Sequence, residues 1–207
     1  MVLFKPRPLL LAVSIGCMLL AETSYALEGK VVDGSTGKPL PGVYVIGAWQ
    51  VIIPMPVEAR SGCSKLEVVR TDEQGKFVLS KWSGSILAHL FGDENLNVYY
   101  YLRGYRWEKG SEATGEVVVL VPDTRSPMEQ LGRIGEPMGK ADCGPLDEQK
   151  TKALPMYRLM YEEAKSIAAS YEERQSLSGM LFMVESLELG ENQAQENATS
   201  RLNRGYR

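Results

Sequence analysis

The sequence predicts a mainly β fold, a seven-stranded β-sandwich with a C-terminal α-helical appendage. Short runs of β-branched and aromatic residues, separated by turn formers, follow one another over residues 28–121, at the spacing of an all-β sandwich. Proline and glycine then become frequent over residues 122–146. Beyond them, apolar residues recur at three- and four-residue steps from Leu154 to Tyr171, which is the period of an amphipathic helix.

The first two strands are predicted at residues 28–33 and 43–53. Gly37 and Pro39 lie between them. Glycine adopts positive φ without steric cost, whereas proline fixes φ and lacks an amide donor. These residues therefore predict a turn, and the β-branched and aromatic residues after it favour a strand.

Residues 54–66 interrupt the strand pattern and are interpreted as a long loop, because Pro54 and Pro56 cannot both lie in a central strand. A hairpin is predicted after this loop, with Gly75 in the left-handed conformation that a short hairpin loop often needs. The hairpin is predicted to comprise strands at residues 66–70 and 76–80 and a turn at residues 71–75.

The last strands are predicted at residues 96–102 and 116–121, with a bend at residues 104–106 between them. The main helix is predicted to begin near Leu154, because Pro155 is tolerated in a first turn. A second helical stretch is predicted from Gln175 to Leu189. The predicted organisation is a signal peptide at 1–26, a sandwich at 27–121, a linker at 122–146, a helical segment at 147–190 and a disordered tail at 191–207.

Three blocks of turn and strand residues stand out in order along the chain: Gly29–Asp33 with Thr36–Val45, then Thr71–Phe77, and finally Gly104–Arg106. The first two resemble the carboxypeptidase regulatory-like domain, and the third is a weaker match. The resemblance covers residues 28–121 and implies a seven-stranded transthyretin/immunoglobulin-like β-sandwich. It implies a fold and no particular chemistry. The block Thr71–Phe77 is similar to the family's Thr-Asp-x-x-Gly-x-Phe hairpin.

Residues 1–26 are predicted to be a signal peptide. Lys5 and Arg7 form a positive region, the run over residues 9–21 is uncharged and mostly apolar, and small side chains favour cleavage after Ala26. That run is shorter than the about 20 apolar residues that a spanning helix needs. The processed protein is therefore expected to be periplasmic or secreted and not an integral membrane protein.

A lipoprotein anchored through Cys17 is the alternative to a cleaved and soluble product. A lipidation motif normally has an aliphatic residue where Ser14 stands, and the apolar run continues past Cys17. The full chain has 23 basic and 26 acidic residues. Removal of residues 1–26 takes away Lys5, Arg7 and Glu22, so the processed chain has 21 basic and 25 acidic residues and a net charge of −4. This balance argues against a nucleic-acid partner, which would favour a clustered basic patch.

Two cysteines remain after processing, Cys63 and Cys143. In an oxidising compartment such a pair is expected to form a disulfide, and a bridge enclosing about 80 residues would stabilise the fold by roughly 4 kcal/mol. Unlinked thiols and metal binding are the alternatives. Metal binding has little support, because the chain has no Cys-x-x-Cys spacing and a single histidine.

A cluster of aromatic residues is the candidate recognition surface, since exposed tyrosine and tryptophan stack on sugars or anchor protein contacts. Strand alternation places Tyr100 opposite Tyr99 and Tyr101, so at least one of these rings is expected to be exposed. Packing within the sandwich is the alternative for these residues. The candidate residues are Trp82, Tyr99, Tyr100, Tyr101, Tyr105 and Trp107.

The predicted function is a non-catalytic accessory module of the cell envelope that recognises protein or glycan. No catalytic, cofactor-binding or metal-ligating residue is assigned. Acidic pairs such as Asp93 with Glu94, or Glu162 with Glu163, are interpreted as solvated side chains. The alternatives are a small hydrolase that uses His89, and a structural envelope protein that assembles through its C-terminal helices; packing of these helices on the sandwich is the preferred interpretation. The sequence predicts no oligomeric state.

Overall fold

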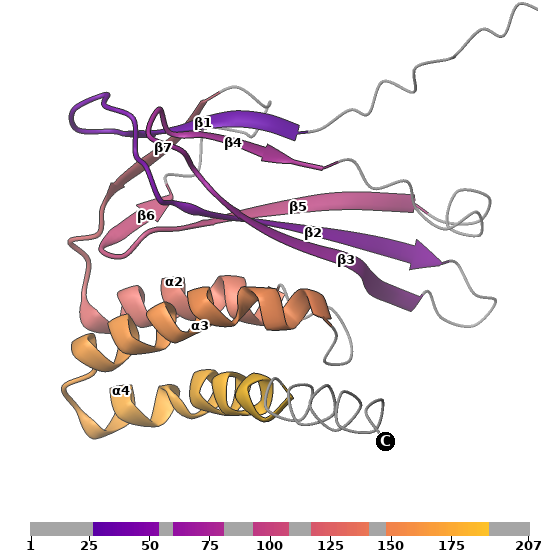
Figure 1. Cartoon of the computed structure of the whole chain (residues 1–207). Coiled ribbons are helices and arrows are strands. Elements are labelled where there is room, and N and C mark those ends of the chain that lie inside the picture. Colours follow the sequence, from indigo (N-terminus) through magenta and orange to yellow (C-terminus); the bar gives the residue numbers. More distant parts are fainter. Residues whose placement is uncertain (1–26, 54–59, 81–92, 108–116, 141–147, 191–207) are drawn as a thin grey trace, which may run out of the picture.

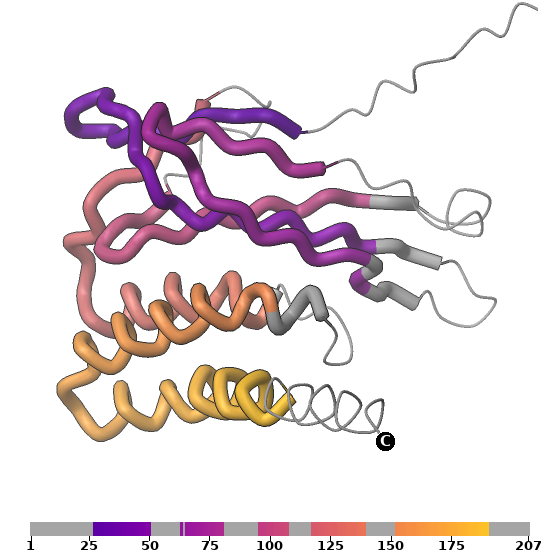
Figure 2. The backbone as a smooth tube through the Cα atoms, viewed as in Figure 1, coloured from indigo at the N-terminus to yellow at the C-terminus, as the bar shows by residue number. Residues whose placement is uncertain are grey.

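The computed structural model describes residues 27–53, 60–80, 93–107, 117–140 and 148–190 (Figures 1 and 2). These residues form seven strands in two sheets, followed by helices. No helix among them is long and apolar enough to cross a membrane. The strands are β1 Leu27–Asp33, β2 Tyr44–Ile53, β3 Arg60–Arg70, β4 Lys76–Leu79, β5 Asp93–Tyr101, β6 Tyr105–Trp107 and β7 Val117–Pro122. The helices are α2 Pro127–Lys140, α3 Glu148–Ile167, α4 Tyr171–Ser176 and a further stretch at 178–190.

The strands divide into a four-stranded sheet, ordered β4-β1-β7-β6, and a three-stranded sheet, ordered β3-β2-β5. β1 and β7 are parallel, whereas the other pairs are antiparallel. Figure 1 shows one sheet above the other. Apolar side chains from both sheets meet in one buried cluster, which we call the inter-sheet core. It contains Val31, Val43, Val45, Trp49, Phe77, Leu79, Tyr100, Val118 and Leu120.

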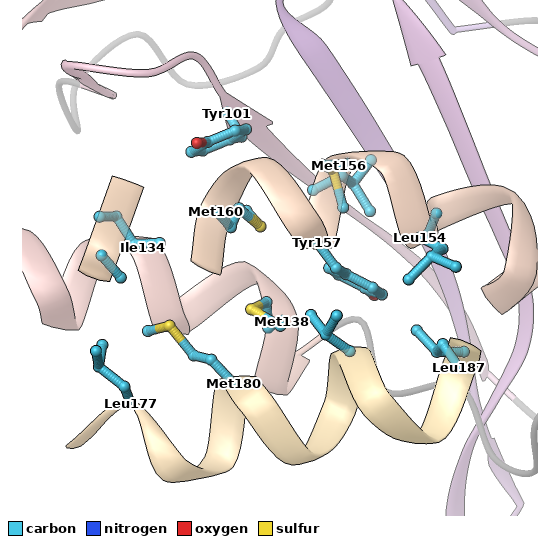
Figure 3. Packing of buried hydrophobic residues seen from close by; sticks show 14 of the residues in the cluster. Tyr101, Ile134, Met138, Leu154, Met156, Tyr157, Met160, Leu177, Met180 and Leu187 are labelled. Atoms are coloured by element: carbon cyan, nitrogen blue, oxygen red, sulfur yellow. The ribbon is translucent and has the colours of Figure 1, made fainter. Parts of the chain in front are cut away.

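The helices cover the outer face of the three-stranded sheet (Figure 1). Residues of α3 such as Met156 and Met160 are fully buried there, in one cluster with Ile46 of β2 and Tyr101 of β5. Leu177, Met180 and Leu187 close the same cluster from the other side (Figure 3). We call it the helix–sheet core. The preferred prediction, that the helices pack on the strands of their own chain, is therefore confirmed.

The fold class is mixed α/β rather than mainly β, because the helices form a layer comparable in size to the strands. The prediction of a linker at 122–146 is wrong for residues 127–140, because these form helix α2. Pro127 is the first residue of that helix, where a missing amide donor costs nothing, although Pro137 lies inside it. Leu131, Ile134 and Met138 recur at three- and four-residue steps and are buried, and this packing outweighs the cost of proline and glycine.

The predicted hairpin at 66–80 is also wrong in its pairing. β3 pairs with β2, whereas β4 pairs with β1, so the turn at 71–75 carries the chain from one sheet to the other. β3 also begins at Arg60, within the predicted loop. The predicted turn at 71–75 does form, with Gly75 in the expected left-handed conformation. The Asp72 carboxylate accepts hydrogen bonds there from the amides of Gln74 and Lys76 at 2.9 and 2.8 Å.

Two helix boundaries differ from those predicted. α3 includes Glu148, ahead of the predicted start near Leu154, so Pro155 lies inside the helix and not in its first turn. The second predicted helix is divided into α4 and the stretch 178–190, with a turn at Leu177. Ser170 and Glu173 form a capping box that starts α4.

Gly75 has a φ of +73°, and a Cβ added there would lie 2.5 Å from the carbonyl oxygen of Val31. Gly37 has a φ of +68°, but a Cβ there would meet nothing within 4 Å. We expect Gly37→Ala to cost about 1 kcal/mol for the left-handed backbone alone. Gly75→Ala is expected to cost roughly 1–3 kcal/mol more because of the clash. Urea unfolding of both variants checks this difference, and equal losses would contradict it.

Candidate functional site

A pocket of about 360 Å³ lies where the edge strands of both sheets meet helix α2. β5 is an edge of the three-stranded sheet and β6 is an edge of the four-stranded sheet. The volume is within the range of small-molecule sites. We call this space the arginine–aromatic pocket. Its lining residues are Tyr99, Tyr100, Arg106, Trp107, Arg125, Arg133, Glu136 and Pro137.

Strand residues provide the aromatic wall of the pocket. Tyr100 points between the sheets and packs against Phe77 and Trp107, with ring centroids 6.0 and 5.9 Å apart. Burial raises the pKa of its hydroxyl to about 12. Tyr99 faces the helices and is half-buried, as is Trp107. Three of the six predicted recognition residues, Tyr99, Tyr100 and Trp107, therefore line one pocket.

The other predicted recognition residues have different roles. Tyr101 is only 2% exposed and belongs to the helix–sheet core. The Tyr105 hydroxyl donates to the Asp33 carboxylate at 2.9 Å, and this bond lowers the pKa of Asp33. Trp82 lies outside the described residues. The expectation of an exposed ring at positions 99–101 is wrong, because helices cover the face of β5 that was expected to meet solvent.

Helix α2 and the segment before it provide the polar wall. Arg133 lies on the flank of α2, because Leu131 and Ile134 take the face that packs into the helix–sheet core. Glu136 and Pro137 follow one turn later and line the same pocket. Arg125 lies in the segment just before the helix. The amide of Asp123, in the same segment, donates to the carbonyl of Gly104 at 2.8 Å. This bond fixes the segment against the turn before β6.

An ionic network with two buried carboxylates holds two of the pocket arginines. Arg125 donates from Nε and Nη2 to the two carboxylate oxygens of Asp123, both at 2.8 Å. Arg133 donates from Nη2 to Oε1 of Glu163 at 2.9 Å. Its Nε lies 2.9 Å from Oδ2 of Asp123 but makes no hydrogen bond. The Asp123 and Glu163 side chains are 0% and 4% exposed, so these carboxylates lie behind the arginines.

Glu163 also ties helix α3 to the turn between β5 and β6. It accepts hydrogen bonds from the Tyr101 hydroxyl at 2.9 Å and from the Gly104 amide at 2.8 Å. Burial, reinforced by the Glu163 carboxylate, raises the pKa of Tyr101. The prediction that Glu163 is a solvated acid is wrong, whereas its neighbour Glu162 is exposed.

The pKa of Asp123 lies below its usual value, chiefly because of the hydrogen bonds from Arg125. A carboxyl whose folded-state pKa is depressed stabilises the fold above its unfolded pKa, and this contribution is lost as the pH falls through the folded pKa. We therefore expect Asp123→Asn to be less stable than the wild type near pH 7. The difference should shrink at about pH 3 and below. Urea unfolding at both pH values measures it; a difference that grows in acid would contradict this expectation.

Several predicted sites cannot be placed in this pocket. Cys63 is half-buried on β3, with its Sγ 3.4 Å from the Lys65 carbonyl oxygen. Its predicted disulfide partner Cys143 lies outside the described residues, as does His89, so both assignments stay predictions. Over the part of the chain that the structure describes, no group of three or more histidine, cysteine, aspartate or glutamate residues is placed to hold a metal ion.

The sequence provided no signal for the polar half of the pocket. Arg125 and Arg133 fell in the predicted linker, where charged residues are expected to be solvated. The spacing of Leu131, Ile134 and Met138 is the signal that could have revealed α2, and with it the position of Arg133.

No family model and no curated protein match this sequence. Two variants of the shaft pilin SpaA from Lactobacillus rhamnosus GG are similar over 48% of this chain, at 12% identity, with TM-scores of 0.28 and 0.27. A 9R-lipoxygenase from Cyanothece PCC8801 is similar over 71% of this chain and 24% of its own, at 15% identity and a TM-score of 0.29. The chain spans 47% of the pilin chains. Likenesses this distant carry no argument about function.

Proposed function

We propose that this protein is a non-catalytic, exported binding module of the cell envelope that recognises a glycan through the arginine–aromatic pocket. The observation that carries the proposal is the meeting of Tyr99, Tyr100 and Trp107 with three arginines in one pocket of about 360 Å³. Aromatic rings provide a surface on which a sugar ring stacks, and guanidinium groups donate hydrogen bonds in a fixed plane.

The proposed domain is a transthyretin/immunoglobulin-like sandwich of the carboxypeptidase regulatory-like kind. Its support is that the two sequence blocks of the resemblance contact each other. The Thr71 hydroxyl donates to the Leu40 carbonyl at 2.7 Å and accepts from the Val43 amide at 2.9 Å. Phe77, the last residue of the second block, is 4% exposed and lies in the inter-sheet core. The motif residues thus act in folding, which leaves recognition to other residues.

The two alternative functions have less support among the described residues. A hydrolase would use His89, which lies outside them. A structural protein would assemble through the apolar stripe of its helices, but Leu154, Tyr157 and Met160 of that stripe are buried within the chain. Export, and the lipoprotein alternative at Cys17, are proposals that an intact mass of the mature protein tests, because a diacylglycerol adduct adds mass.

Binding of the mature protein to cell-envelope fractions tests the proposed function. We expect Trp107→Ala to weaken binding at least about tenfold, since stacked aromatic residues dominate recognition surfaces. Trp107 is preferred to Tyr100 for this test because Tyr100 is only 8% exposed and its loss would disturb the inter-sheet core.

Tyr171→Ala is the matched control, because Tyr171 lies on α4, is 74% exposed and does not line the pocket. It should bind as the wild type does. Urea unfolding of each variant separates lost binding from lost folding. Full binding by a folded Trp107→Ala protein would overturn the proposed function.

A further inference from the structure

We infer that the ligand of the arginine–aromatic pocket is an acidic saccharide, whose carboxylate or phosphate lies on the arginines while its ring stacks on the aromatic wall. This inference rests on the proposed function and specifies its ligand class. Three of the eight lining residues are arginines and one is an acid, Glu136. Such a composition favours an anion at the pocket surface.

Two of the arginines are held in position before a ligand arrives. Arg125 and Arg133 are 37% and 13% exposed at their side chains, and their hydrogen bonds to Asp123 and Glu163 use Nε and Nη2. No hydrogen bond from Nη1 of either residue is made to another described residue. These donors remain for a ligand. Fixing them in advance reduces the conformational entropy that binding would otherwise cost.

The buried carboxylates do not cancel this attraction. They lie behind the arginines, with their side chains 0% and 4% exposed, whereas both arginines line the pocket. Because Coulomb energy falls with distance, an anion about 4 Å from a guanidinium and about 8 Å from the carboxylate behind it is attracted about twice as strongly as it is repelled. Arg106 on β6 adds a third positive charge to the lining.

The rest of the lining fits a sugar better than a bare anion. Trp107 and Tyr99 are half-buried, so part of each side chain is accessible beside the arginines. Glu136 is exposed at α2 and provides a carboxylate that accepts hydrogen bonds from hydroxyl groups. A ligand with one anionic group, several hydroxyls and an apolar ring face uses all three kinds of lining residue.

Calorimetric titration of the mature full chain tests the inference with three probes: digalacturonate, the neutral disaccharide galactobiose, and galactose 6-phosphate. We expect digalacturonate or galactose 6-phosphate to bind at least about tenfold more tightly than galactobiose. The two acidic probes distinguish a carboxylate from a phosphate. The preference should shrink as salt is raised, because exposed charge pairs are screened.

Arg106→Gln and Arg125→Gln should each reduce that preference, while Arg103→Gln should leave it unchanged. Arg103 is the matched control, because it is exposed, lies three residues before Arg106 and does not line the pocket. The salt dependence of the wild-type protein gives a second measurement that does not depend on any variant folding correctly.

The outcomes separate this inference from the proposed function. Equal binding of galactobiose and both acidic probes, or a preference that salt and Arg106→Gln leave intact, overturns the inference. The same holds if none of the probes binds. In each of these cases the proposed function stands if Trp107→Ala weakens binding to envelope fractions as expected, and it falls with the inference if Trp107→Ala binds those fractions fully.

Discussion

Glu163→Ala is expected to lower the free energy of unfolding by about 3–5 kcal/mol, because it removes one partner of a buried ion pair together with three hydrogen bonds. In the wild type, Glu163 accepts hydrogen bonds from the Tyr101 hydroxyl, the Gly104 amide and the Arg133 guanidinium. Its two carboxylate oxygens accept these three bonds, and the substitution removes both oxygens at once. Arg133 would then lose its hydrogen bond to Glu163 and keep its ion pair with Asp123, whose Oδ2 lies 2.9 Å from Nε.

Glu162→Ala is the matched control, since it makes the same chemical change at the adjacent, exposed position of α3. We expect its effect to stay within about 0.5 kcal/mol. Urea unfolding near neutral pH measures both variants. Equal effects at the two positions would mean that the network around Glu163 does not hold the helices on the sheet.

Met160→Ala is expected to cost about 2–5 kcal/mol, the range for removing a large buried side chain. Met160 is 0% exposed and lies in the helix–sheet core beside residues of α2, α3 and the three-stranded sheet (Figure 3). Its loss would leave a cavity where these layers meet. Because the same packing places α2 at the pocket, the variant should also bind envelope fractions more weakly at temperatures where it begins to unfold.

Leu159→Ala provides the control for this prediction. Leu159 precedes Met160 on the same helix but is 45% exposed. The expected loss is below about 1 kcal/mol, because little apolar surface returns to water and no closed cavity forms. Chemical denaturation compares the two variants. A loss at Leu159 as large as that at Met160 would contradict the packing of α3 described here.

The strands could be predicted because their signals are local. Turn residues such as Gly37 and Gly75 have positive φ as expected, and the β-branched runs between the turns form strands. Strand pairing was harder, because it depends on partners distant in sequence. The turn at 71–75 reads as a hairpin, yet β4 pairs with β1 so that Phe77 and Leu79 enter the inter-sheet core.

Three of the eight residues that line the candidate pocket could be predicted from the sequence. The aromatic wall came from the local composition around Tyr99 and Trp107, which needs no tertiary information. The arginine wall could not be found in this way, since Arg125 and Arg133 reach the pocket only after α2 packs on the sheet. Proline and glycine concealed that helix, because their intrinsic cost is visible in the sequence while the burial that offsets it is not.

We propose that ligands bind where β5 and β6 meet α2. An NMR titration of the labelled mature protein with soluble fragments of envelope glycan locates the binding residues one by one. We expect shifts of the Trp107 indole and of the Arg106 and Arg125 side-chain signals, with the buried Trp49 indole unchanged as an internal reference. Saturable shifts confined to other surfaces, such as the exposed Phe182 and Leu189 of the last helix, would contradict it.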